Sequence, residues 1–156
     1  MFILPLREQL EVFVDEHRAA LHRCLDDLTE DQARTRSVPS MTTLLGLVKH
    51  ATFVERVWFG EAVTGKSRSE LGIVAGPAES FVLEDGDTIE SVRAAHRAAC
   101  QQSRRATEML SLEDVVTGNR RGDLPLRWVY LHVLRELAQH CGHADILREQ
   151  ILGDRG

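Results

Sequence analysis

Apolar residues recur three or four positions apart in four long stretches of this chain, which is the spacing of one face of an α-helix. The stretches cover about 5–28, 41–65, 87–110 and 125–152. Between the second and third, residues 66–86 show no sustained period and contain several glycines, so we expect a long connection there. The pattern predicts an all-α protein, an up-down four-helix bundle with one longer crossover loop.

Local signals set the expected ends of these helices. Ser40 is the expected N-cap of the second helix, and Asp87 with Glu90 resembles a capping box at the start of the third. Pro125 suits the first turn of the last helix, and Gly153 suits its C-terminal end.

The composition is typical of one globular domain spanning residues 1–156. Hydrophobic residues make up 43% of the chain, enough for a core that needs no disulfide or metal to fold. The net charge is -5 and there is no basic run, so nucleic acid is not an expected partner. No apolar run approaches the roughly 20 residues of a membrane span, and the start, MFILPLREQLEVF, lacks the features of a secretory leader. We therefore expect a cytoplasmic protein.

Three cysteines lie inside the predicted helices, without the C-x-x-C spacing of a redox or zinc motif. They are Cys24, Cys100 and Cys141. Their odd number argues against a disulfide framework, and we expect reduced thiols that are buried or half-buried.

The last predicted helix carries polar side chains on the face that should be apolar. At about 100° per residue, one arc of roughly 80° contains His132, Glu136, His140 and His143. Glu136 and His140 are one turn apart, so their side chains can reach a common atom. An ionised carboxylate in a bundle core needs a cationic or hydrogen-bonding partner. The arc therefore predicts either a metal site or a buried network of hydrogen bonds.

His50 interrupts the second predicted helix in the same way, because its neighbours three and four residues away are apolar. Two histidines and one carboxylate on facing helices form a facial triad, which suits zinc, nickel or iron and leaves positions open for water or substrate. We predict His50, Glu136 and His140 as the metal ligands.

The remaining histidines leave alternatives open. His143 could replace Glu136 as the third ligand, because it follows His140 by three residues. His132 lies one turn before Glu136 and could orient that carboxylate without binding the metal. Two others interrupt apolar stripes, and we expect them to be half-buried with local partners: His17 and His96.

The segments SMTTLLGLVKHATFVERVWFGE and LRWVYLHVLRELAQHCGHADILREQI resemble the DinB-like superfamily of four-helix metal-binding proteins. In that superfamily, a histidine on the second helix and two ligands one turn apart on the last helix hold the metal. His50 matches the first position, and Glu136 with His140 matches the pair. Many members have histidine where this chain has Glu136, whereas the metal-binding domain of the mycothiol-dependent maleylpyruvate isomerases has glutamate. The resemblance therefore implies the mycothiol-dependent branch.

The function that this resemblance implies is a divalent-metal-dependent thiol S-transferase, with zinc expected before nickel or iron. The metal would bind a thiol of the mycothiol or bacillithiol type as its thiolate, which would then attack a small electrophile. We expect no membrane partner, and we expect a homodimer, because the first two helices carry ample apolar surface. Three alternatives stay open: a metal-dependent hydrolase, a non-catalytic metal-binding and dimerising stress-response protein, and a bundle with a buried polar network and no metal.

Overall fold

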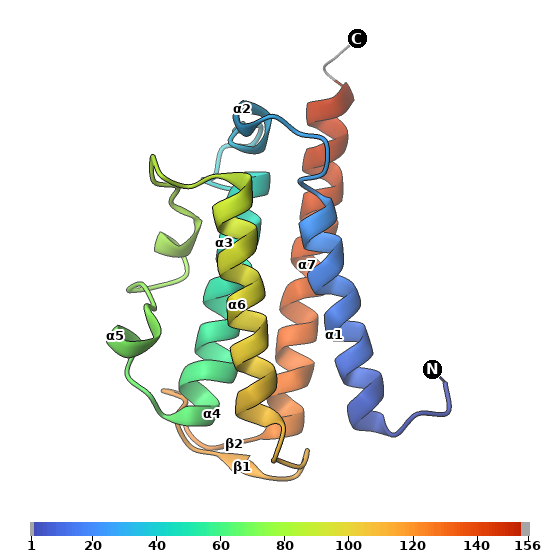
Figure 1. Cartoon of the computed structure of the whole chain (residues 1–156), viewed down its shortest axis with the longest axis vertical. Helices are drawn as coiled ribbons and strands as arrows, with labels where there is room; N and C mark the ends of the chain where they lie inside the picture. Colours follow the sequence, from blue (N-terminus) through green and yellow to red (C-terminus); the bar gives the residue numbers. More distant parts are fainter. Residues whose placement is uncertain (1, 154–156) are drawn as a thin grey trace.

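The computed structural model of the chain describes residues 2–153, and four long helices stand side by side in it (Figure 1). They are α1 (Leu6–Arg23), α3 (Leu44–Glu55), α6 (Ile89–Thr107) and α7 (Leu126–Gly153). In Figure 1 the chain runs upward in α1, downward in α3 and α6, and upward in α7. The all-α prediction is confirmed, with one crossover (65–88) that returns the chain to the top before α6. As a result the helices do not simply alternate in direction along the chain.

Short elements join the long helices. They are α2 (Glu30–Ala33), the π-helix η1 (Arg56–Glu61), α4 (Ala62–Thr64), α5 (Arg68–Leu71), the 3-10 helix η2 (Glu79–Phe81), β1 (Val115–Val116) and β2 (Leu124–Pro125). The π-helix continues α3 without a gap, and the two strands form an antiparallel pair between α6 and α7. The crossover carries α5 and η2, so the segment expected to be a plain connection contains ordered helical turns.

The helix α3 is buried on nearly all sides. It packs against α6, α7 and η2, while α1 packs mainly against α7. Its fully buried apolar residues are Leu44, Leu45, Leu47 and Val48. A helix in this position has almost no solvent face, so its polar side chains must be buried with the apolar ones. The two that matter below are His50 and Glu55, which are 4% and 1% exposed.

The N-cap of α3 is Thr43, and the prediction of Ser40 was wrong. Thr43 has an extended backbone, and its hydroxyl accepts a hydrogen bond from the N–H of Gly46 at 2.9 Å. The hydroxyl of Ser40 donates instead to Thr42. Three hydroxyl residues precede the helix, and the path of the backbone selects which one caps it.

The predicted capping box of α6 was also wrong. Thr88 and Ser91 form it, one residue later than expected. The carboxylate of Asp87 accepts hydrogen bonds from the side chain of Lys49 at 2.6 Å and from the N–H of Glu84 at 2.8 Å. These contacts outside the helix make Asp87 part of the crossover.

Pro125 lies in β2 rather than in the first turn of α7, which corrects another expected boundary. The first N–H groups of the helix are satisfied by the preceding loop, because Leu126 donates to the carbonyl of Asp114 and Arg127 to that of Leu112. The helices α1 and α6 also end earlier than predicted. Leu25 extends the apolar period beyond α1 although it lies in a turn, since it is still packed in the core.

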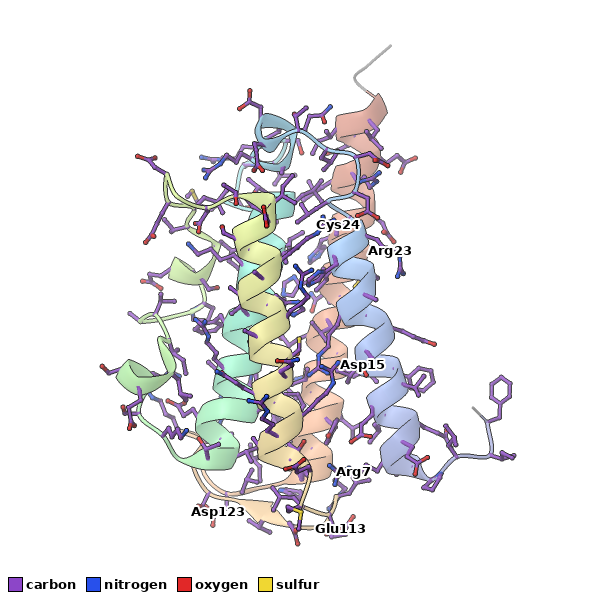
Figure 2. The ribbon with its side chains drawn as sticks, viewed as in Figure 1. Arg7, Asp15, Arg23, Cys24, Glu113 and Asp123 are labelled. Carbon is purple, nitrogen blue, oxygen red and sulfur yellow. The ribbon has the colours of Figure 1, made fainter. Side chains whose placement is uncertain are left out.

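Polar side chains join α1 to α6 on the face shown in Figure 2. Asp15 accepts hydrogen bonds from Arg18 of its own helix and from Arg104 of α6, both at 2.8 Å. Near the start of α1, Arg7 donates to the carbonyl of Thr107 at 2.7 Å. Within the described residues, no helix combines the length and apolar character that crossing a membrane requires.

Candidate metal centre

The side chains of His50, Glu136 and His140 meet between α3 and α7. One ligand atom from each lies within 4.8 Å of the other two. Oε2 of Glu136 is 3.5 Å from Nε2 of His140 and 3.9 Å from Nε2 of His50. The two imidazole rings stand edge to face, with centroids 4.7 Å apart. The structure thus brings together the three residues predicted as ligands.

This cluster is closed toward α3 and open toward solvent on the side of α7. The side chain of His50 is 5% exposed, whereas those of Glu136 and His140 are 29% and 16% exposed. A catalytic metal site needs one accessible coordination position in addition to its protein ligands. The unequal burial provides an approach for a small molecule.

The charges in the cluster suit a cation. The neighbouring imidazole of His140 holds the pKa of Glu136 well below its usual range, so this carboxylate is an anion at neutral pH. Burial lowers the pKa of His50, which is therefore a neutral imidazole. Neutral imidazole nitrogen and carboxylate oxygen are ligands of zinc and related divalent metals. Donor atoms around a tetrahedral zinc ion lie about 3.3–3.6 Å apart, so small side-chain rotations would suffice to bind one.

Two residues of the crossover contact the imidazole ring of His50. Nδ1 of His50 lies 2.6 Å from the hydroxyl oxygen of Ser80, and the ring of Phe81 stacks on the imidazole with centroids 4.2 Å apart. Both residues belong to η2. Sequence reasoning missed them because they lie in a segment without helical period, where no pattern marked them.

His132 lies in an aromatic cluster next to this centre. Its ring stacks on Trp128 and packs against Trp58, with centroids 5.0 and 4.2 Å away. Nδ1 of His132 accepts a hydrogen bond from Arg135 at 2.6 Å. The hydrogen bonds of the described residues include none between His132 and Glu136, and the ring of His132 packs against tryptophans instead of orienting that carboxylate.

His143 is exposed and lies beside His140. Its Nδ1 is 3.4 Å from Nδ1 of His140, which is not the nitrogen that faces Glu136. His143 is thus placed next to the ring of a predicted ligand, outside the group formed by His50, Glu136 and His140.

A second group of metal-ligand types is fully buried between α3 and α6, namely Glu55, His96 and Cys100. The carboxylate of Glu55 accepts two hydrogen bonds from Arg18, at 2.7 and 2.8 Å, and one from Ser103 at 2.6 Å. Burial raises the pKa of the Cys100 thiol to about 12, so it is protonated at neutral pH. Metals bind thiolates rather than thiols, and the charge of the Glu55 carboxylate is already balanced by Arg18. The group is therefore less suited to a metal than the cluster at His50.

The other histidines and cysteines mostly follow expectation. His17 is half-buried with the Phe13 carbonyl 2.6 Å from its Nδ1. His96 has a partner, His22 at 2.7 Å, but it is fully buried rather than half-buried, because side chains from α1 and α3, His22 and Glu55, lie next to its ring. All three cysteines are free, Cys24 and Cys100 buried and Cys141 half-buried, as predicted.

The helical fold, with a histidine on α3 facing a Glu/His pair on α7, is that of a DinB-like protein. The family model of the mycothiol-S-transferases matches residues 9–153, and the chain belongs to that family.

A comparison with solved structures finds a similar fold in a crystal structure of a mutant mycothiol-dependent maleylpyruvate isomerase. The TM-score is 0.63 and the sequence identity is 16%, a level at which the likeness shows a shared fold alone. The match covers 88% of this chain and 60% of that chain, so this protein spans less than two thirds of the isomerase. No curated protein matches the sequence.

Proposed function

We propose that this protein is a divalent-metal-dependent transferase that joins a thiol of the mycothiol or bacillithiol type to a small electrophile. One observation carries the proposal: Nε2 of His50 and Nε2 of His140 flank the same oxygen of Glu136 within 3.9 Å, on a side open to solvent. Membership in the mycothiol-S-transferase family supports the choice of thiol.

The residues that would hold the metal are His50 from α3 and Glu136 with His140 from α7. We propose zinc, with nickel or iron as the alternatives, because two imidazoles and one carboxylate suit all three ions. When bound, the ion supplies a Lewis acid that lowers the pKa of a thiol. The ring of Phe81 covers His50 and keeps water from that side. A thiol would therefore approach past Glu136 and His140.

We also propose that the protein acts as a homodimer in the cytoplasm, where low-molecular-weight thiols stay reduced. The second of the two helices expected to supply apolar surface, α3, is buried in the core and has no large exposed apolar side chain, so support for a dimer comes from α1 and α7. The large apolar side chains exposed on these two helices are Leu6, Phe13, Leu131 and Ile146. Light scattering of the purified protein tests this part, and a monomer at micromolar concentration would reject it.

The first experiment is the metal content of purified, untagged protein by mass spectrometry. We expect about one metal per wild-type chain and little in His50→Ala and Glu136→Ala, each of which removes one of three ligands. His17→Ala is the matched control, because it removes a histidine of α1 outside the cluster, and it should keep the metal. Wild-type protein without metal, even after reconstitution with zinc and nickel ions, would reject the metal centre.

The second experiment measures loss of free thiol when mycothiol or bacillithiol is mixed with an aryl halide or an epoxide. We expect turnover that needs the metal and is lost in His140→Ala. Metal binding with ester hydrolysis but without thiol transfer would favour the hydrolase. Metal binding without either reaction would favour a non-catalytic role.

A further inference from the structure

Two short hydrogen bonds connect the ring of His50 to the backbone of the crossover. Nδ1 of His50 lies 2.6 Å from Oγ of Ser80, and that oxygen lies 2.5 Å from the carbonyl oxygen of Pro77. His50 and Ser80 are 4% and 3% exposed, so solvent has little access to either partner.

The direction of these hydrogen bonds follows from the chemistry of the groups. A carbonyl oxygen only accepts, so the hydroxyl proton of Ser80 lies between its oxygen and that of Pro77. Ser80 has no second proton to donate, and its oxygen must therefore accept one from Nδ1–H of His50. A neutral imidazole carries a single N–H, which leaves Nε2 of His50 with a free lone pair.

That lone pair faces the candidate metal centre. Nε2 of His50 is 3.9 Å from a carboxylate oxygen of Glu136, so two hydrogen-bond acceptors point at each other. Such an arrangement is unfavourable unless a cation or a hydrogen-bond donor such as water lies between them. A divalent cation in this position would be bound by Nε2 of His50.

The crossover holds Ser80 firmly against α3. Phe81 stacks on the imidazole of His50 with an angle of 12° between the rings, and the side chain of Lys49 donates to the carbonyl of Val82 at 2.9 Å. At Gly46 the backbones approach so closely that a Cβ atom would lie 3.2 Å from the Phe81 carbonyl oxygen. These contacts are made by the two residues that follow Ser80, and they hold this part of the crossover next to α3.

We propose that Ser80 is a positioning residue of the metal centre, which holds the proton of His50 on Nδ1 and thereby presents Nε2 to the metal. The proposal rests on the proposed function for the identity of the ligand and on the hydrogen bonds above for the role of Ser80. In metal sites generally, a partner on the second ring nitrogen fixes the tautomer and the orientation of a histidine ligand.

The first test needs no metal. Nitrogen-15 NMR of the metal-free protein at pH 8 distinguishes the two neutral forms of an imidazole, and we expect His50 to carry its proton on Nδ1. Ser80→Ala should shift His50 toward a mixture of both forms. Thr52→Val is the matched control, because it removes a buried hydroxyl of α3 that has no hydrogen-bond partner among the described residues. A wild-type proton on Nε2, or an unchanged spectrum in Ser80→Ala, would overturn the proposal.

The second test measures zinc affinity by competition with a chelator. We expect Ser80→Ala to bind zinc about 10–100-fold more weakly than wild type, as is typical for loss of an orienting partner. Ser80→Thr keeps the hydroxyl and should recover most of the affinity, while Thr52→Val should bind like wild type. If Ser80→Ala does not fold, Ser80→Cys takes its place. Its side chain is similar in size but its sulfur is a weaker acceptor, so this variant should bind zinc more weakly than wild type.

The outcomes separate the two proposals. If wild type and Ser80→Ala bind zinc equally well, the role of Ser80 is wrong and the metal centre stands. If wild type binds no zinc, the proposed function is wrong, and the role of Ser80 in metal binding is lost with it.

Discussion

Nε2 of His140 lies 3.5 Å from Oε2 of Glu136, one turn earlier on the same helix. This contact follows from α-helix geometry, because residues four apart lie one above the other. The third group, His50, comes from α3, which runs antiparallel to α7 (Figure 1). A metal bound by all three would link the two helices and favour the folded chain.

A strong chelator should therefore lower the melting temperature of wild-type protein. A metal that binds only the folded state adds about 2.7 kcal/mol at 100 times its dissociation constant. At about 2–4 °C per kcal/mol for a chain of this size, the expected shift is about 5–10 °C. Calorimetry with and without chelator measures it, with Glu136→Ala as the variant that should not respond. Equal melting temperatures for wild type would contradict a metal bound in the native state.

Mild acid should destabilise the protein through His96, which is fully buried. Burial lowers the pKa of His96 from 6.5 to about 4. The unfolded chain therefore takes up a proton in this window that the folded chain does not. The contribution of His96 to the free energy of unfolding is fully present above pH 6.5, and up to about 3 kcal/mol of it is lost as the pH drops toward 4.

Urea unfolding at several pH values measures this loss. His96→Gln should show a shallower decline between pH 6.5 and 4. Equal slopes for wild type and His96→Gln would show that another group causes the decline.

Removing the charge of Glu55 should strongly destabilise the fold. Arg18 is 11% exposed and Glu55 is completely buried at the side chain, so Glu55→Gln removes the buried carboxylate that pairs with Arg18. We expect a loss of about 3–5 kcal/mol in urea unfolding. Replacing both residues, as Arg18→Met with Glu55→Leu, should cost less than Glu55→Gln alone, because no charge is left behind.

Asp15 provides the control for this pair. It accepts a hydrogen bond from the same Arg18 but is 48% exposed, so Asp15→Asn should cost less than about 1 kcal/mol. Similar losses for Asp15→Asn and Glu55→Gln would contradict the importance of burial.

Two glycines should respond in opposite ways to alanine. A Cβ atom on Gly118 would lie 2.1 Å from the carbonyl oxygen of Glu61, so Gly118→Ala must displace backbone and should cost about 1–3 kcal/mol. Gly142 lies within α7 with open space around it, and Gly142→Ala should stabilise the protein by up to about 1 kcal/mol. Thermal unfolding of both variants measures the difference, and a neutral Gly118→Ala would contradict the close approach of the two segments.

Local periodicity was sufficient to predict the long helices, since each helix must turn its apolar face toward the core. It failed at their ends. Thr43 rather than Ser40 caps α3, and Leu25 packs in the core from a turn beyond α1. Hydroxyl residues and apolar residues next to a helix look the same in sequence whether or not the helix reaches them, and packing decides the boundary.

The sequence by itself determined that Glu136 and His140 lie one turn apart on the same face of a helix, because this depends on spacing within one helix. Only the tertiary structure decided what surrounds them. Ser80 reaches His50 from the crossover, 30 residues along the chain, and Arg18 reaches Glu55 from α1. These contacts join segments that are far apart in the chain. They depend on how the whole bundle packs, which the apolar periodicity of a single helix does not specify.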